Sequence, residues 1–241
     1  MTVSKVMSFF REQAKILRGI VYNRIYVAKD TERDVVTQFH KLYYDSYFFG
    51  KTWGSTYWLG TKILKCPLDM FIYQELIFAM RPDIIIETGT AHGGSALFMA
   101  TICDLVGCGE IVTIDVEDQP DRPSHERITY LLGSSTSDEI KGKVRERIGD
   151  KGQVLVILDS DHRKEHVLHE LQLYSAFVPK GGYVIVEDTH VNGHPVEPDF
   201  GPGPMEAVNE FVKWDGDFVI DKSKEKFYMT FNPNGYLQRI N

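Results

Sequence analysis

The chain has 241 residues, of which 43% are hydrophobic and 25% charged, so it can bury a full globular core. Its formal net charge of −7 argues against a general binder of nucleic acid or membrane surfaces, because phosphate-rich partners need a basic face. Its three cysteines match no disulfide or zinc pattern, and neither a signal peptide nor an apolar run of about 20 residues is evident, so we expect a cytoplasmic protein.

The first third of the chain, residues 1–80, has a helical and aromatic character. Apolar residues at helical spacing predict helices over 7–21, 31–44 and 67–80, and a loop rich in rings and glycines over 47–60. We expect 1–80 to form a helical cap that contacts substrate or a second copy of the chain in a homo-oligomer.

From residue 81 onward, short Ile- and Val-rich runs alternate with helical segments. This alternation is typical of an α/β fold, a doubly wound Rossmann-like parallel sheet with helices on both faces. The predicted strands are 83–87, 110–115, 128–132, 154–158 and 183–186, and the predicted helices are 95–104, 137–148, 164–176 and 205–214. Segments 217–220 and 227–231 are expected to close the sheet as an antiparallel pair.

The segment 87–95 reads ETGTAHGGS and lies where the first strand turns into a helix. Glycines there allow close approach of a ligand, and the helix N-terminus favours carboxylate or phosphate groups. Asp115 closes the next strand and could accept both hydroxyls of a ribose. The pattern differs from the dinucleotide fingerprint G-x-G-x-x-G, which argues against NAD. The alternative is a tight turn that binds nothing.

Three carboxylates follow the fourth and fifth strands: Asp159, Glu187 and Asp188. Adjacent parallel strands bring these ends together, where the charges repel unless a proton or a cation neutralises them. Oxygen ligands suit Mg²⁺, Mn²⁺ or Ca²⁺, and such a cation would lower the pKa of a bound hydroxyl. The alternative role, capping the helices that follow, fits Asp161 well but fits Glu187 and Asp188 poorly.

His162 lies three residues beyond Asp159, within reach of a hydroxyl held at such a metal, and is our candidate general base; a surface position is the alternative. His92 is expected to line the cofactor pocket, and His190 or His194 could orient substrate. The remaining histidines are expected to be ordinary surface residues: His40, His125, His166 and His169.

These motifs together resemble class I methyltransferases with a bound metal, and more closely the cephalosporin hydroxylase family, which includes O-methyltransferases of macrolide sugars. The resemblance covers residues 50–235 and is carried by 87–95, by LDSDH at 158–162, by IVEDTHVNG at 185–193 and by FGPGPMEA at 200–207.

The resemblance implies that residues 81–241 form an S-adenosylmethionine (SAM)-dependent methyltransferase domain. It implies a SAM site made by Glu87, Thr88, Gly89, His92, Ser95, Asp115, Ser135 and Asp159. It implies a divalent metal, Mg²⁺ first, on Asp159, Glu187 and Asp188, with His162 as the base. The expected reaction is methyl transfer to a hydroxyl of a small molecule, a sugar or other natural product.

Several alternatives stay open from the sequence. The same scaffold could carry a cephalosporin-type hydroxylase, although no facial triad of two histidines and a carboxylate is apparent, or a non-catalytic SAM-binding protein. The segment 191–204 could be a lid or a rigid connection. Trp53, Tyr57 and Trp58 could stack on an acceptor or belong to the core.

Overall fold

The computed structural model describes residues 13, 14, 17 and 29–241. The chain divides into two compact units, Met1–Leu42 and Tyr43–Asn241. The predicted helix over 7–21 lies almost entirely outside the described residues, whereas the second predicted helix is confirmed as α2, Lys29–Asp45. Within the described part of the chain, no helix is long and apolar enough to cross a membrane.

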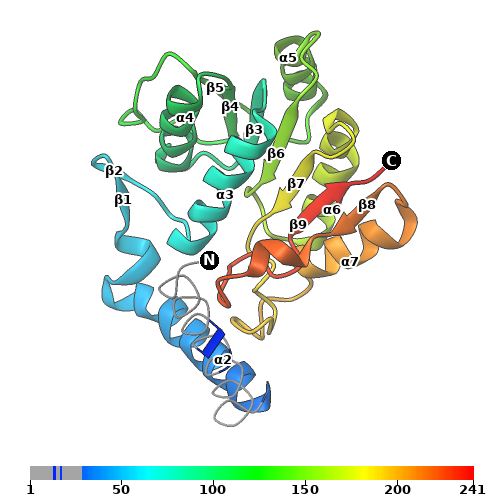
Figure 1. The fold of residues 1–241 in the computed structure, drawn as a ribbon. Helices are drawn as coiled ribbons and strands as arrows, with labels where there is room; N and C mark the ends of the chain where they lie inside the picture. The colour runs from blue at the N-terminus through cyan, green and yellow to red at the C-terminus, as the bar shows by residue number, and fades with distance from the viewer. Residues whose placement is uncertain (1–12, 15–16, 18–28) are drawn as a thin grey trace, which may run out of the picture. The chain divides into compact units, whose positions relative to one another are not determined.

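The larger unit is built on a seven-stranded sheet in the order β5-β4-β3-β6-β7-β9-β8 (Figure 1). The first five strands in this order are parallel, and β9 is antiparallel to both of its neighbours. The strands are β3 Ile84–Thr88, β4 Glu110–Asp115, β5 Ile128–Leu132, β6 Val154–Leu158, β7 Tyr183–Val186, β8 Phe218–Ile220 and β9 Tyr236–Arg239. The predicted α/β fold with a doubly wound sheet is therefore confirmed.

Helices cover both faces of this sheet, because its central strands are apolar on both sides. One face packs against α3 Pro67–Met80 and α4 Gly94–Val106 through side chains such as Ile85 and Leu155. The other face packs through Ile84 and Ile86 against α5 Asp138–Ile148, α6 Lys164–Tyr174 and α7 Pro204–Trp214. The cap boundary at residue 80 stays a prediction, and α3 shares a core with α4.

The prediction of a closing strand over 227–231 was wrong, and β9, at Tyr236–Arg239, takes that place in the sheet. Residues 227–231 leave the sheet because α3 holds them: the carboxylate of Asp69 accepts hydrogen bonds from the Thr230 hydroxyl and from the backbone N–H of Phe231. The apolar side chains of Met229 and Phe231 fill a separate small core with Cys66. Alternation of apolar residues alone does not distinguish such a buried loop from a strand.

The predicted loop over 47–60 contains short elements that the sequence did not reveal. They are the 3-10 turns η1 Ser46–Phe49 and η2 Thr52–Ser55 and the hairpin of β1 Tyr57–Trp58 with β2 Thr61–Lys62. Two further 3-10 turns are η3 Ser175–Phe177, which shortens the predicted helix over 164–176, and η4 Lys222–Glu225.

The register of the parallel strands aligns their carboxyl ends. Thr88 of β3 pairs with Ile114 of β4 and Leu158 of β6, and Leu158 pairs in turn with Val186 of β7. The residues that follow these four positions therefore lie side by side at one edge of the sheet: Gly89, Asp115, Asp159 and Glu187. In an open α/β sheet this edge is where ligands bind.

Candidate functional site

A cavity of about 620 Å³ opens at this edge. Six of the residues predicted for the site line it: Gly89, Asp115, Ser135, Asp159, His162 and Asp188. Glu87, Thr88, Ser95 and Glu187 are buried and do not line it, whereas His92 lies at a small adjacent hollow together with Gly89 and Asp159. The predicted site residues thus gather around one cavity and the layer beneath it.

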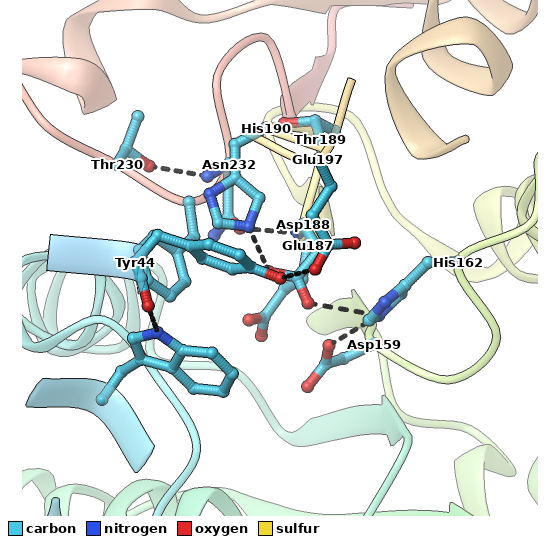
Figure 2. Close-up of polar contacts among 12 residues, drawn as sticks. Tyr44, Asp159, His162, Glu187, Asp188, Thr189, His190, Glu197, Thr230 and Asn232 are labelled. Atoms are coloured by element: carbon cyan, nitrogen blue, oxygen red, sulfur yellow. Dashed lines mark hydrogen bonds and ion pairs between the residues drawn. The ribbon is translucent and has the colours of Figure 1, made fainter. Parts of the chain in front are cut away.

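Asp159, His162 and Asp188 form the polar centre of the cavity. The imidazole Nε2 of His162 lies 3.2 Å from Asp159 Oδ1 and 3.4 Å from Asp188 Oδ2 (Figure 2). Each residue offers a ligand atom, and these three atoms lie within 4.8 Å of one another. The carboxylate oxygens of Asp159 and Asp188 fit a divalent cation such as Mg²⁺ or Mn²⁺, and the imidazole of His162 lies beside them.

Charge controls the protonation of this centre. Burial lowers the pKa of His162, but the carboxylates of Asp188 and Asp159 outweigh it and raise the pKa to about 9. Burial raises the pKa of Asp188, but His162 and His190 hold it well below its usual range. At neutral pH, without a cation, His162 is therefore an imidazolium between two carboxylates.

Asp188 is held in an unusual conformation. Its φ of +52° lies in the left-handed region, which costs a non-glycine residue about 1–3 kcal/mol and is typical of functional sites. Its backbone N–H donates to Asn232 Oδ1 at 3.1 Å, and its Oδ1 lies 3.1 Å from the Nε2 of the fully buried His190. His190 therefore supports Asp188 from behind and does not line the cavity.

Lys65 is the residue that sequence reasoning missed. It is only 4% exposed, and its ammonium donates to Asp159 Oδ2 at 2.5 Å and to Glu187 Oε1. Burial lowers the pKa of Lys65, but Asp159 and Glu187 outweigh burial and raise it, so the side chain stays charged. The pKa of Glu187 is raised by burial and by Asp159. In this structure the predicted third metal ligand is thus bound to a buried lysine.

No signal in the sequence marks Lys65. It stands in the segment 61–66, TKILKC, where a lysine next to apolar residues is most often a surface residue at an element boundary. Its partner Asp159 is 94 residues away in the sequence. Only the fold brings the two together.

Asp115 and Ser135 line the other end of the cavity. Asp115 Oδ2 accepts hydrogen bonds from the backbone N–H of Ala91 at 2.8 Å and from Arg122 at 2.9 Å. Ser135 Oγ lies 3.3 Å from Nε2 of His166. A carboxylate and a seryl hydroxyl at the ends of β4 and β5 provide hydrogen-bonding partners for a nucleoside.

Residues beneath the cavity shape its floor. Thr88 accepts the backbone N–H of Asp159 through its carbonyl oxygen at 3.0 Å, and Glu87 accepts the hydroxyl of Thr113 at 2.6 Å. The other oxygen of Glu87, Oε1, lies without a hydrogen-bond partner among the described residues. Gly89 has a φ of +87°, and a Cβ there would lie 1.7 Å from the carbonyl oxygen of Asp159. Gly89 is needed for this close packing of two loops.

The structure bears on three predictions about individual residues. His166, predicted as a surface residue, lines the cavity and lies 3.1 Å from Ser160 Oγ, since helix α6 turns it inward. Asp161 is bound by Arg163, which lowers the pKa of Asp161 to about 2, and it lies outside the cluster of Asp159 with His162. His40 is buried, not a surface residue.

The aromatic residues proposed for an acceptor separate into two groups. Trp53 lines the cavity together with Tyr44 and Phe200. Trp58 packs against Phe98 at 4.8 Å, and Tyr57 is 62% exposed away from the cavity. Only Trp53 of the three proposed rings is placed to contact an acceptor.

A parallel sheet in this strand order, with one reversed strand and acidic residues at the carboxyl ends of β4, β6 and β7, defines the class I methyltransferase fold. Residues 50–240 match the family described as Rhamnosyl O-methyltransferase/CmcI, and the chain belongs to that family. It is 34% identical to the rhamnosyl O-methyltransferase of Mycobacterium leprae over 234 residues, which cover 95% of this chain and 99% of the relative. The corresponding Mycobacterium tuberculosis protein is 35% identical over 212 residues, 85% of each chain.

Solved structures agree on the fold. A CmcI structure with Mg and SAM superposes with a TM-score of 0.58 at 20% identity, covering 77% of each chain. MycE, a methyltransferase of mycinamycin biosynthesis in complex with Mg and S-adenosylhomocysteine (SAH), gives a TM-score of 0.52 at 16% identity over 83% of this chain and 53% of that one. The predicted family and fold class are therefore confirmed.

Proposed function

We propose that this enzyme transfers a methyl group from SAM to a hydroxyl of a sugar, in a reaction that requires a divalent metal, and that the acceptor is a deoxyhexose of the rhamnosyl type. The observation that carries the proposal is the cluster of Asp159, His162 and Asp188 in a cavity whose other end presents Asp115 and Ser135. The relatives that cover nearly the whole chain are named rhamnosyl O-methyltransferases.

The residues divide between cation and cofactor. Asp159 and Asp188 would hold the cation, together with the third predicted ligand, Glu187, whose Oε1 accepts a hydrogen bond from Lys65. The remaining predicted residues, which surround the cofactor end, would hold SAM: Glu87, Thr88, Gly89, His92, Ser95, Asp115 and Ser135. When bound, the cation lowers the pKa of the acceptor hydroxyl and SAM supplies the methyl group.

His162 would receive the proton of the acceptor hydroxyl at Nε2, the atom that faces Asp159 and Asp188. To act as a base, His162 must first lose the proton that the two carboxylates stabilise. A cation held by Asp159 and Asp188 would oppose protonation of the neighbouring imidazole and so favour the neutral form of His162 that can act as a base. The other contribution of the protein is to position the two reactants for in-line attack.

A hydroxylase on the same scaffold is less well supported. The cluster in the described residues contains one histidine and two carboxylates, whereas an iron oxygenase of the facial-triad type uses two histidines and one carboxylate. The second nearby histidine, His190, is fully buried behind Asp188.

Calorimetric titration with SAM and SAH, with and without Mg²⁺, tests the cofactor, and methylation of methyl rhamnoside tests the reaction. Asp159→Asn and Asp188→Asn are expected to reduce Mg²⁺ affinity and turnover by 100-fold or more, on the order of the loss of a metal ligand. Asp161→Asn is the matched control, because Asp161 lies outside the cluster, and we expect near-normal Mg²⁺ binding. Unchanged turnover in both cluster variants would exclude the metal mechanism.

A further inference from the structure

We propose that Tyr44 and Glu197 form a polyol-recognition pair that binds a second, non-reacting hydroxyl of the acceptor and so selects sugars over simple alcohols. This inference rests on the proposed function and names residues that the reaction itself does not require. Both side chains line the cavity that holds Asp159, His162 and Asp188. Figure 2 shows Tyr44 and Glu197 beside this cluster.

Tyr44 presents its hydroxyl from a rigid support. Its ring stacks on Trp53 with centroids 5.5 Å apart and an interplanar angle of 22°, and its carbonyl accepts the indole N–H of Trp53 at 3.2 Å. The ring of His190, which supports Asp188, meets the ring of Tyr44 edge-on at 5.0 Å. His190 therefore contacts both Tyr44 and Asp188.

Glu197 lies in the segment after β7, and its side chain contacts the hydroxyl of Tyr44. Its Oε1 accepts the hydroxyl of Tyr44 at 2.5 Å, a contact between residues 153 positions apart. Its backbone has a φ of +44°, in the left-handed region that non-glycine residues adopt at a cost. Backbone hydrogen bonds hold the segment on both sides of Glu197: Val196 N–H donates to the carbonyl of His190 at 3.1 Å, and Phe200 N–H donates to the backbone carbonyl of Glu197 at 3.0 Å.

The chemistry of this pair fits a polyol. A carboxylate has about four acceptor sites, and a phenolic oxygen also accepts, so the single hydrogen bond between Tyr44 and Glu197 leaves acceptors free for hydroxyl donors. Hydrogen bonds to a charged acceptor are about twice as strong as neutral ones. Trp53 lines the same wall of the cavity and stacks on Tyr44. An acceptor with one hydroxyl can bind only at the cluster of Asp159, His162 and Asp188. A sugar can bind there with one hydroxyl and to the pair of Tyr44 and Glu197 with a second.

The test compares methyl rhamnoside with cyclohexanol as acceptors for the full-length enzyme with saturating SAM and Mg²⁺. For Glu197→Gln and Tyr44→Phe we expect KM for the rhamnoside to rise about tenfold, the usual effect of losing a hydrogen bond to a charged group, with kcat within about threefold. Mg²⁺ and SAH affinities should not change, since neither residue belongs to the cluster. Activity on cyclohexanol should not change either.

Matched controls are Glu210→Gln and Tyr228→Phe, which alter the same atoms outside the cavity. An unchanged KM for the rhamnoside in both test variants, or an equal loss for both acceptors, overturns the inference while leaving the proposed function intact. If the wild-type enzyme methylates neither acceptor, the inference is tested by binding of methyl rhamnoside to the enzyme with SAH and Mg²⁺, monitored by saturation-transfer NMR. Binding that weakens in Glu197→Gln supports the pair, and binding that does not weaken, or is absent, overturns it.

Discussion

At the scale of single residues, the site is organised by alternating charges. Lys65 stands between Asp159 and Glu187, and His162 stands between Asp159 and Asp188. Each of these three carboxylates therefore has a cationic neighbour, which reduces the cost of removing its charge from water. The arrangement keeps three acidic side chains close together before any cation binds.

Lys65→Met is expected to destabilise the enzyme by about 3–5 kcal/mol, because it leaves the buried carboxylate of Glu187 without a counter-charge and removes one of the two cationic neighbours of Asp159. Urea denaturation at pH 7 in the absence of metal measures the effect. Lys143→Met, which removes only a surface pair with Glu139, should remain within about 0.5 kcal/mol. Adding Glu187→Gln to Lys65→Met should recover part of the loss; a Lys65→Met protein as stable as wild type would contradict this account.

His162 gives the metal-free enzyme a defined pH dependence. Its pKa is about 9 in the folded chain against 6.5 in the unfolded chain, so the folded state binds the extra proton. The stabilisation is complete below pH 6.5 and is lost as the pH rises through 9. Urea midpoints of wild type and His162→Gln, with a chelator present, should differ most near pH 6 and converge above pH 9. A constant difference across this range, or the same trend in His169→Gln, would refute the assignment.

At the scale of elements, α3 controls the segment that follows η4. The Asp69 carboxylate, in the first turn of α3, accepts hydrogen bonds from Thr230, Phe231 and Tyr236. Asn232 directly follows Phe231, and its side-chain oxygen accepts a hydrogen bond from the backbone N–H of Asp188. A helix on one face of the sheet thereby helps to fix the conformation of Asp188 in the cluster with Asp159 and His162.

Asp69→Ala should therefore cost about 3 kcal/mol or more of stability, since three buried donors lose their acceptor. It should also weaken Mg²⁺ binding, because Asn232 no longer holds Asp188 in place. Denaturation and calorimetry measure the two effects. Glu75→Gln, on the same helix, breaks only an exposed pair with Lys226 and should alter neither quantity. Normal Mg²⁺ affinity in Asp69→Ala would disprove the coupling.

At the scale of the whole molecule, the site belongs to the larger compact unit. Among the described residues, none before Tyr44 lines the cavity, and the family match begins at residue 50. A homo-oligomer formed by the first 80 residues stays a prediction.

A chain that begins at residue 29, which keeps α2 whole, should bind SAH and Mg²⁺ within about twofold of the full-length enzyme. Calorimetry measures the affinities, and light scattering reports the oligomeric state of both proteins. A change of oligomeric state with unchanged affinity would assign the N-terminal segment to assembly. A loss of SAH binding would show that the segment contributes to the site.

The sequence by itself determined the order of strands and helices, because periodicity and apolar runs are local, and it placed Asp115, Asp159 and Asp188 at strand ends that parallel pairing brings together. The tertiary structure alone decided the partners of those side chains. Lys65 at Asp159, Tyr44 at Glu197 and Asp69 at Phe231 join residues from 94 to 162 positions apart, and no local pattern carries such pairings. The prediction of a strand over the apolar segment 227–231 was wrong for the same reason. The conformation of this segment depends on Asp69, a residue distant in the sequence whose carboxylate accepts the backbone N–H of Phe231.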